Sequence, residues 1–455
     1  MRIMGVYKEG VIPMNKLDAR FHITERGSTM RREIIGGATT FATMAYILIV
    51  QASLMSGTGM NVTGVMISTA LMSGLITLLM ALYANLPFAL GPGMGTNAIL
   101  AGLVAAGGAT WQQALTLIVI SGAIFLLLSL FKVREDMVRV MPKNLKVGVG
   151  AAIGLFLARL GFANSGLVTA SLDGMGDFSD PAVRLAAIGL LIIVVLSFIR
   201  VKINGRVYQV RGPVLISIVI TTIIGLFTGV TQLPDQLMTT SLAPLGDVVF
   251  KFTFKGIFQL AFIPYLIVFF MGDFFSTLGT ALGLGAKANM LDKDGNLPGI
   301  GRVFLVDAIG SVAGGMMGLT TITTYVESAS GVEAGARTGF ASVVTSIFFF
   351  ASMLFAPLFI SIPTAATAPA LIMVGISMLG VLRDVDFDPI DWTPVALMMF
   401  MTVFMNDFAA GIALGVISHV IIHLAMGLLS GDREKLPSVG TIILGLLMCT
   451  KFINF

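Results

Sequence analysis

The chain of 455 residues is built from apolar stretches long enough to cross a lipid bilayer. A membrane-spanning helix needs about 20 mostly apolar residues. Candidate spans are 34–54, 62–83, 109–130, 146–163, 183–199, 212–230, 257–285, 300–318, 338–360, 363–381, 391–404 and 408–429. Charged residues make up only 11% of the chain, against roughly 25% in soluble domains. The sequence therefore predicts an all-α polytopic membrane protein and excludes a soluble enzyme, a disordered chain and a nucleic-acid-binding protein.

Two further apolar stretches, 86–106 and 319–336, are interrupted by residues that disfavour helix. The first contains Pro87, Pro92 and several glycines, and the second contains a run of threonines before Tyr325. Counting both gives fourteen spans, with the broken ones third and tenth. Their separation by seven spans predicts a seven-plus-seven inverted repeat, in which each broken span is a short extended stretch followed by a half-helix. Ordinary kinked helices with packing glycines are the alternative.

The distribution of Lys and Arg predicts the orientation, because cytoplasmic loops of membrane proteins carry the excess of these residues. With residues 1–33 inside and no cleavable signal peptide, all but five of the 28 Lys and Arg residues fall on the cytoplasmic side. Of the five exceptions, four are predicted to lie outside, namely Arg159, Arg184, Lys251 and Lys255, and Lys451 is not assigned to either side. Both termini are thus predicted to be cytoplasmic in a multi-pass plasma-membrane protein. The apolar tail 437–455 is predicted to be an interfacial or docked helix.

Acidic side chains within membrane spans are costly and mark functional sites. Asp273 lies in the eighth span with Thr277 and Thr280 on the same helix face. Glu327 begins the half-helix of the tenth span, where it either contacts a ligand or stabilises the helix N-terminus. Asp307 in the ninth span is either a structural hydrogen-bond partner or a proton-coupling group.

Neutral residues near these acids have equally open roles. Asn97 either caps the half-helix of the third span or contacts the ligand, and Phe274 either packs or stacks on it. The three histidines, His22, His419 and His423, are scattered along the sequence and are interpreted as structural or interfacial. Neither a metal nor another cofactor is therefore expected.

Carboxylates and an amide without an opposing cation suit a neutral ligand that donates N–H hydrogen bonds. A desolvated carboxyl can also take up a proton in the working range and couple transport to protons. These residues predict a proton-coupled carrier of a polar, uncharged small molecule, without distinguishing a nucleobase from a polyol. The sequence contains no P-loop and no His-Glu-x-x-His motif, so an enzyme is not expected.

Several motifs together resemble the AzgA-type adenine/guanine/hypoxanthine permeases of the nucleobase/ascorbate transporter superfamily. They are Gly-Gly-Ala-Thr-Thr-Phe-Ala-Thr-Met-Ala-Tyr-Ile at 36–47, Gly-Pro-Gly-Met-Gly-Thr-Asn-Ala at 91–98, Asp-Phe-Phe-Ser-Thr-Leu-Gly-Thr at 273–280, Thr-Thr-Tyr-Val-Glu-Ser-Ala-Ser-Gly-Val-Glu-Ala-Gly-Ala-Arg-Thr-Gly at 323–339 and Ala-Pro-Ala-Leu-Ile-Met-Val-Gly at 368–375. The resemblance implies import of a purine nucleobase with protons rather than sodium, by an elevator-type movement.

The resemblance also implies a domain organisation and a set of site residues. The core domain would comprise 34–130 and 257–360, the gate domain 131–230 and 361–430, with 1–33 as a cytoplasmic segment, 431–455 as a tail, and a homodimer through the gate domain. Substrate contacts would come from Glu327, Asp273, Asn97, Thr43, Phe274 and Ser328, and proton coupling from Asp273, Glu327 and Asp307.

This chain departs from the family pattern at three places that bear on function. Ser276 stands where the family usually has Asp, which bears on proton coupling. Ile99 and Leu100 stand where aromatic residues are usual, and the first span reads Val-Gln-Ala at 50–52 instead of Val-Asn-Pro. A carrier of another heterocycle, an anion carrier or channel of the sulfate-transporter type, and a non-transporting receptor therefore remain alternatives.

Overall fold

The computed structural model describes residues 16–130, 142–169, 174–203, 206–210, 212–292, 297–431 and 436–452. The helices of the first half are α1 (Lys16–Phe21), α2 (Met30–Met44), α3 (Tyr46–Ser56), α4 (Val62–Leu79), α5 (Met94–Ala105), α6 (Trp111–Leu130), α8 (Lys143–Ser165), α9 (Pro181–Phe198) and α10 (Pro213–Thr228). Those of the second half are α11 (Ile263–Lys287), α12 (Ile300–Met316), α13 (Ser328–Glu333), α14 (Gly339–Ser352), α15 (Ala356–Ile360), α16 (Thr364–Met378), α17 (Pro389–Phe404), α18 (Phe408–Ser430) and α19 (Val439–Cys449). Four short strands are β1 (Leu90–Pro92), β2 (Arg200–Ile203), β3 (Arg206–Gln209) and β4 (Ile322–Thr324).

The apolar stretches form the predicted helices. Within the described ranges, nine helical stretches are long and apolar enough to cross a membrane, and Met94–Ala105, Pro213–Thr228, Pro389–Phe404 and Val439–Phe452 are shorter apolar helices. The first span begins at Met30 and not at residue 34, because Thr29 caps α2 by accepting a hydrogen bond from the Arg32 amide. Fourteen spans related by an inverted repeat stay a prediction.

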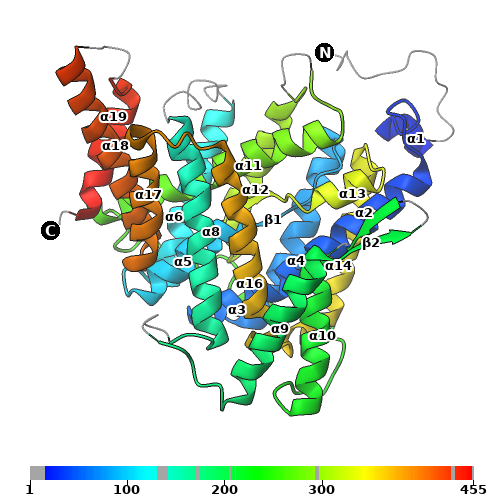
Figure 1. Ribbon diagram of the computed structural model, residues 1–455. Helices are drawn as coiled ribbons and strands as arrows, with labels where there is room; N and C mark the ends of the chain where they lie inside the picture. The colour runs from blue at the N-terminus through cyan, green and yellow to red at the C-terminus, as the bar shows by residue number, and fades with distance from the viewer. Residues whose placement is uncertain are drawn as a thin grey trace.

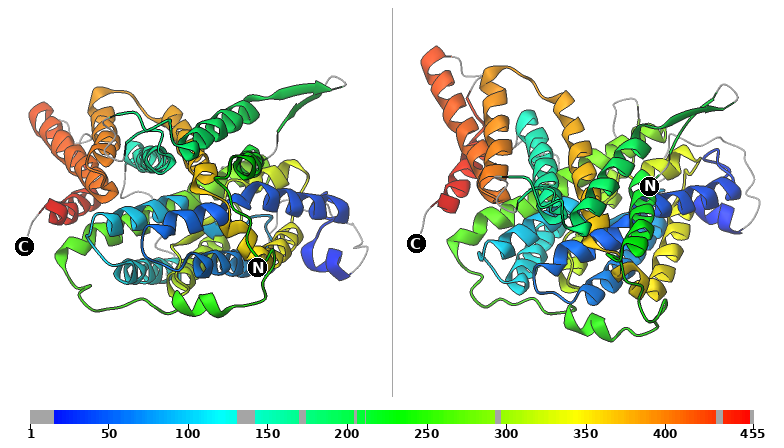
Figure 2. Two further views of the ribbon diagram at one scale, coloured as in Figure 1. Left: turned by 90° about the horizontal axis from the view of Figure 1, so that it is seen from below. Right: turned by 60° about the horizontal axis from the view of Figure 1, so that its bottom comes forward.

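One short hairpin was not expected from the sequence. Strands β2 and β3 pair antiparallel with Arg200 opposite Gln209, and this hairpin extends from the ends of α9 and α10 (Figure 1) and away from the other helices (Figure 2). Arg200–Gln209 joins α9 to α10 in the segment that the charge pattern assigns to the cytoplasm. Short exposed hairpins of this kind carry no apolar periodicity long enough to be recognised by hydropathy.

The helices divide into two groups that form two layers when seen from below (Figure 2, left). In the first helix group, α2 and α4 pack on α14, and α6 packs on α12 and α11. In the second helix group, α8 packs on α16 and α17, α9 packs on α10 and α16, and α17 packs on α18. Small residues allow the closest approach, since a Cβ on Gly154 of α8 would lie 2.7 Å from the carbonyl oxygen of Gly375 on α16.

The apolar tail forms α19, which packs along α18. The Lys451 ammonium lies 2.6 Å from the Asp407 carboxylate, which caps the first residues of α18. The docked helix expected for 437–455 is therefore confirmed for the described part of the tail. Because the tail turns back along α18, the end of the described chain lies beside the beginning of α18 and not beside Ser430.

The two broken segments meet where β1 and β4 pair antiparallel. Leu90 lies opposite Thr324, Gly91 opposite Thr323 and Pro92 opposite Ile322. Each strand is followed by a helix, α5 after β1 and α13 after β4. The predicted extended stretch followed by a short helix is confirmed in both segments. Non-helical backbone survives within an apolar protein because each strand supplies the other's hydrogen bonds.

Candidate substrate site

The strand β4 and the residues around it form the centre of the site, because almost every side chain from 320 to 328 contacts another element. Ser328 accepts a hydrogen bond from the Ala89 amide at 3.0 Å, and the Tyr325 hydroxyl donates to the Pro92 carbonyl. The Gly93 amide donates to the Thr321 carbonyl at 2.8 Å, which extends the pairing past β1. These bonds fix the two broken segments against each other.

Glu327 lies at the start of α13 and is held by residues of the first span. The Tyr46 hydroxyl donates a hydrogen bond to Glu327 Oε1 at 2.7 Å, and the Thr43 hydroxyl donates to the Glu327 backbone carbonyl at 3.3 Å. Tyr46 is buried, whereas Glu327 is half-buried and the adjacent Val326 is exposed. The carboxylate is thus held by Tyr46 at a position that is only partly buried. Thr43, named above as a substrate contact, thus lies beside Glu327 through the backbone, and its contact with substrate stays a prediction.

Asp273 and Asp307 lie together behind β4, both fully buried. The Ser311 hydroxyl donates to Asp273 Oδ2 at 2.5 Å, and Asp273 Oδ1 has no hydrogen-bond partner within the described residues. Asp307 interacts electrostatically with Asp273 and lies beside Thr277, whose hydroxyl is 2.6 Å from that of Thr323. Two such buried carboxyls cannot both carry a charge at low cost, because each charge repels the other in surroundings without water.

Asn97 joins the two broken segments instead of capping α5. Its Oδ1 accepts a hydrogen bond from the Thr320 hydroxyl, and its amide nitrogen lies 4.0 Å from the Met94 sulfur. One residue earlier, the Thr96 hydroxyl lies 3.0 Å from the Thr321 hydroxyl. Asn97 is fully buried, so its position in this structure is that of a connector beside the site.

Phe274 and Ser328 have structural partners. Phe274 is buried in an aromatic cluster and stacks on Phe304 with ring centroids 5.2 Å apart and on Phe270 at 5.9 Å. The Ser328 hydroxyl is engaged by the backbone, as described above. Ile99, at a position where the family usually has an aromatic residue, lines a small pocket with Phe156, which belongs to the second helix group.

Sequence reasoning missed Tyr46, Ser311 and Thr320, each of which holds a predicted site residue. The signal for Tyr46 was available: a tyrosine inside an apolar span needs a hydrogen-bond partner when it is buried. Hydroxyls such as Ser311 and Thr320 give no such signal, because Ser and Thr commonly bond to their own helix backbone.

Comparison with known proteins places the chain in a family. The Permease family (Xan_ur_permease) matches residues 31–410. This protein is a member of that family. Adenine permease AdeQ of Escherichia coli is 36% identical over 377 residues, covering 82% of each chain. Guanine/hypoxanthine permease PbuG of Bacillus subtilis is 36% identical over 398 residues, covering 84% of this chain and 87% of its own.

Family membership makes this permease a multi-pass membrane transporter and not an enzyme. The fold is that of the transmembrane domain of the cyanobacterial bicarbonate transporter BicA, with a TM-score of 0.60 at 18% identity. That match covers 85% of this chain and 97% of the BicA domain. The resemblance stated from the sequence motifs is therefore confirmed.

Proposed function

We propose that this permease imports a purine nucleobase, adenine, guanine or hypoxanthine, together with protons. The relatives reported above are named as permeases for these bases. Their names and the chemistry of the site both support purine transport. The observation that carries the proposal is the Glu327 carboxylate, oriented by Tyr46 at the crossing of the two broken segments.

A half-buried carboxylate suits the N–H edge of a purine. It accepts hydrogen bonds strongly, and a charge-assisted bond contributes roughly 1.5–3 kcal/mol. In the described part of the chain no Lys, Arg or His forms an ion pair with Glu327, Asp273 or Asp307, so an inorganic anion would be repelled. This is why we favour a neutral base over an anion, although BicA, which shares the fold, transports bicarbonate.

Protons are proposed to bind at the Asp273–Asp307 pair. Strand β4 connects the pair to Glu327. Its Thr323 contacts Thr277, which lies beside Asp307, and Glu327 follows three residues after Thr324, the last residue of the strand. Movement of β4 on substrate binding would therefore change the surroundings of the acids. Asp307 in this arrangement supplies the second acid that the family pattern places at Ser276.

The movement proposed is of the elevator type, with the first helix group as the core domain and the second helix group as the gate domain. Its support is the packing: helices contact one another mainly within each group, and the site residues belong to the first group. Dimerisation through the gate domain and a cytoplasmic N-terminal segment belong to the same proposal, the latter on the distribution of Lys and Arg.

The test is uptake of labelled adenine, guanine and hypoxanthine by a transport-deficient bacterial host that expresses the permease, with and without a protonophore. Saturable uptake of one base that the protonophore abolishes supports the proposal. Uptake that ignores the protonophore contradicts proton coupling. Membrane-inserted protein that takes up none of the three contradicts the purine assignment and favours another heterocycle or an anion.

Matched variants make the test specific for the site. Glu327→Gln should lower uptake at least tenfold, in line with the roughly 1.5–3 kcal/mol of a charge-assisted hydrogen bond. Its control is Glu333→Gln on the same short helix, where the exposed carboxylate pairs with Lys287 at 2.5 Å. Asp307→Asn should abolish accumulation against a gradient while leaving counterflow of labelled base, whereas Asp235→Asn in an exposed loop should change neither. Full accumulation by Asp307→Asn would remove the pair from the coupling mechanism.

A further inference from the structure

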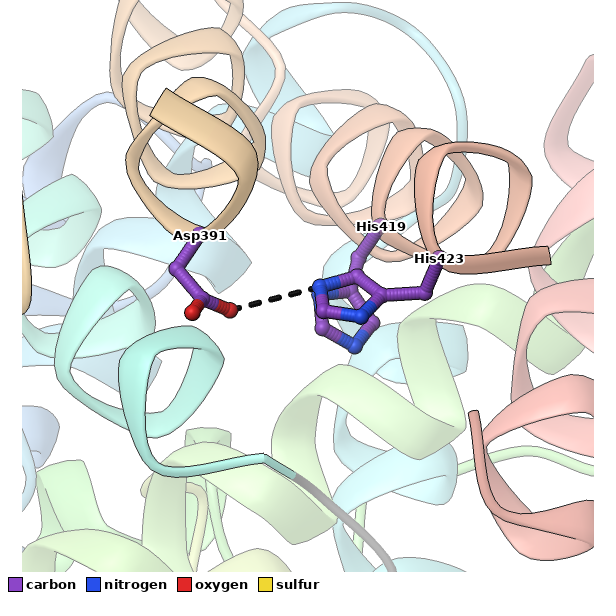
Figure 3. Close-up of side chains that lie close together, drawn as sticks. All are labelled: Asp391, His419 and His423. Atoms are coloured by element: carbon purple, nitrogen blue, oxygen red, sulfur yellow. Dashed lines mark ion pairs between the residues drawn. The ribbon is translucent and has the colours of Figure 1, made fainter. Parts of the chain in front are cut away.

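Two histidines and an aspartate gather between α17 and α18 in the second helix group, outside the site described above (Figure 3). His419 and His423 lie one turn apart on α18, so both project from the same face of that helix. Asp391 projects towards them from the first turn of α17. The histidines look scattered along the sequence, because nothing local to α18 indicates that Asp391 packs against it.

The spacing of the three side chains fits a small metal ion. One possible ligand atom from each residue lies within 4.8 Å of the others. Asp391 Oδ1 and His423 Nε2 are 3.3 Å apart. Zinc binds nitrogen and carboxylate oxygen at about 2.0–2.2 Å in tetrahedral geometry, which places two ligand atoms roughly 3.3–3.5 Å apart. The Asp391–His423 pair already stands at that separation.

The surroundings of His419 point in the same direction. Its side chain is 3% exposed, and its Nδ1 has no hydrogen-bond partner within the described residues. The two imidazole rings stack with centroids 3.9 Å apart and planes inclined by 37°. A buried ring nitrogen without a hydrogen-bond partner in the described part of the chain thus lies beside a second imidazole, as a metal site with nitrogen ligands requires.

We propose that Asp391, His419 and His423 form a binding site for a divalent transition-metal ion of the zinc type. Two imidazoles favour zinc, nickel or copper over magnesium and calcium, which prefer oxygen ligands. Asp391 and His423 keep 37% and 17% of their side-chain surface exposed, which leaves a path for the ion and a fourth position for water. The bound ion would clamp the beginning of α17 to α18.

The proposed metal site lies on other helices than the candidate substrate site. The metal ligands lie on α17 and α18, whereas Glu327, Asp273 and Asp307 lie on or beside α11, α12 and α13. The proposed ion is therefore a component of the second helix group and not a participant in base binding. Whether the permease transports purines does not decide whether this site binds metal.

The test uses tag-free, full-length permease in lipid nanodiscs, stripped of metal with a chelator. Zn²⁺ is titrated in competition with a chromophoric chelator, Co²⁺ is added as a spectroscopic probe of tetrahedral geometry, and thermal stability is followed with each ion and with Mg²⁺. We expect one Zn²⁺ per chain, a visible tetrahedral Co²⁺ spectrum, and stabilisation by Zn²⁺ but not by Mg²⁺.

Variants separate this site from incidental histidine binding. Replacing an outer-shell partner of a metal typically costs 10–100-fold in affinity, so removing a ligand should cost at least that much. His419→Ala and Asp391→Asn should each do so, and Asp391→Asn keeps the proposal testable if the buried His419→Ala does not fold. His22→Ala is the control, since His22 pairs with Glu25 at 2.8 Å in the segment before α2.

Three results would overturn the proposal: no saturable Zn²⁺ binding by the unsubstituted protein, equal loss of binding in His22→Ala, or Zn²⁺ affinity unchanged in Asp391→Asn and His419→Ala. In each case the three side chains would be an ion pair with stacked imidazoles and nothing more.

Discussion

Tyr46→Phe isolates the contribution of one hydroxyl to substrate affinity. Tyr46 is 1% exposed and donates a 2.7 Å hydrogen bond to Glu327 Oε1. Phenylalanine keeps the ring and its packing, so the substitution removes only the bond that orients the carboxylate. A hydrogen bond to a charged group contributes roughly 1.5–3 kcal/mol, which corresponds to about 10- to 150-fold in an equilibrium constant.

We expect an effect at the lower end of that range. Glu327 is half-buried, so water can replace part of the lost hydrogen bond. The apparent KM for base uptake should therefore rise about tenfold, while the maximal rate changes much less, because the carboxylate proposed to bind the base is still present. Tyr83→Phe is the matched control, since Tyr83 is 46% exposed.

The assay is initial uptake of labelled base over a range of concentrations, normalised to the amount of protein in the membrane. Binding of base to purified Tyr46→Phe, Glu327→Gln and the double variant then completes a double-mutant cycle. If Tyr46 acts through Glu327, the tyrosine substitution should add little once the carboxylate is gone. An unchanged KM in Tyr46→Phe, or fully additive losses in the cycle, would refute the reasoning.

Three further substitutions test the packing that supports the site. Glu33→Gln should lower thermal stability by roughly 1.5–3 kcal/mol, because the buried carboxylate accepts backbone hydrogen bonds from Arg337, Thr338 and Ala341 before α14 and in its first turn; an unchanged melting temperature would contradict this. Gly375→Ala should cost about 1–3 kcal/mol through overpacking against α8, whereas Gly380→Ala, which has open space around it, should be neutral. Lys451→Met should expose α19 to limited proteolysis at a cost of about 1 kcal/mol, since the ion pair with Asp407 is only partly buried; equal digestion rates would show that apolar packing alone holds the tail.

The two broken spans illustrate how much local sequence can predict. Prolines and glycines in 86–106 and threonines in 319–336 disfavour helix wherever they stand, so the extended stretches were predictable from residue chemistry. Their matching positions in the two halves indicated that they would meet. The register, Gly91 opposite Thr323, was not predictable, because it depends on how helices distant in sequence pack around the strands.

The acids show the same division. That Asp273, Asp307 and Glu327 matter followed from the cost of charge inside an apolar span. That Asp273 and Asp307 form a pair, and that Glu327 is held by a tyrosine 281 residues away, did not. The role of Phe274 could not be predicted, because the sequence around an aromatic residue does not distinguish packing in an aromatic cluster from contact with a ligand.

Hydropathy and residue chemistry, which act over about twenty consecutive residues, determined the membrane-spanning character, the position of the helices, the two breaks and the acidic residues of this permease. Tertiary structure alone decided which of these residues lie together: Tyr46 with Glu327, Asp307 with Asp273, and His419 and His423 with Asp391. The physical reason is that these residues belong to segments far apart in the chain, so they meet only when close packing of the helices brings their polar groups together.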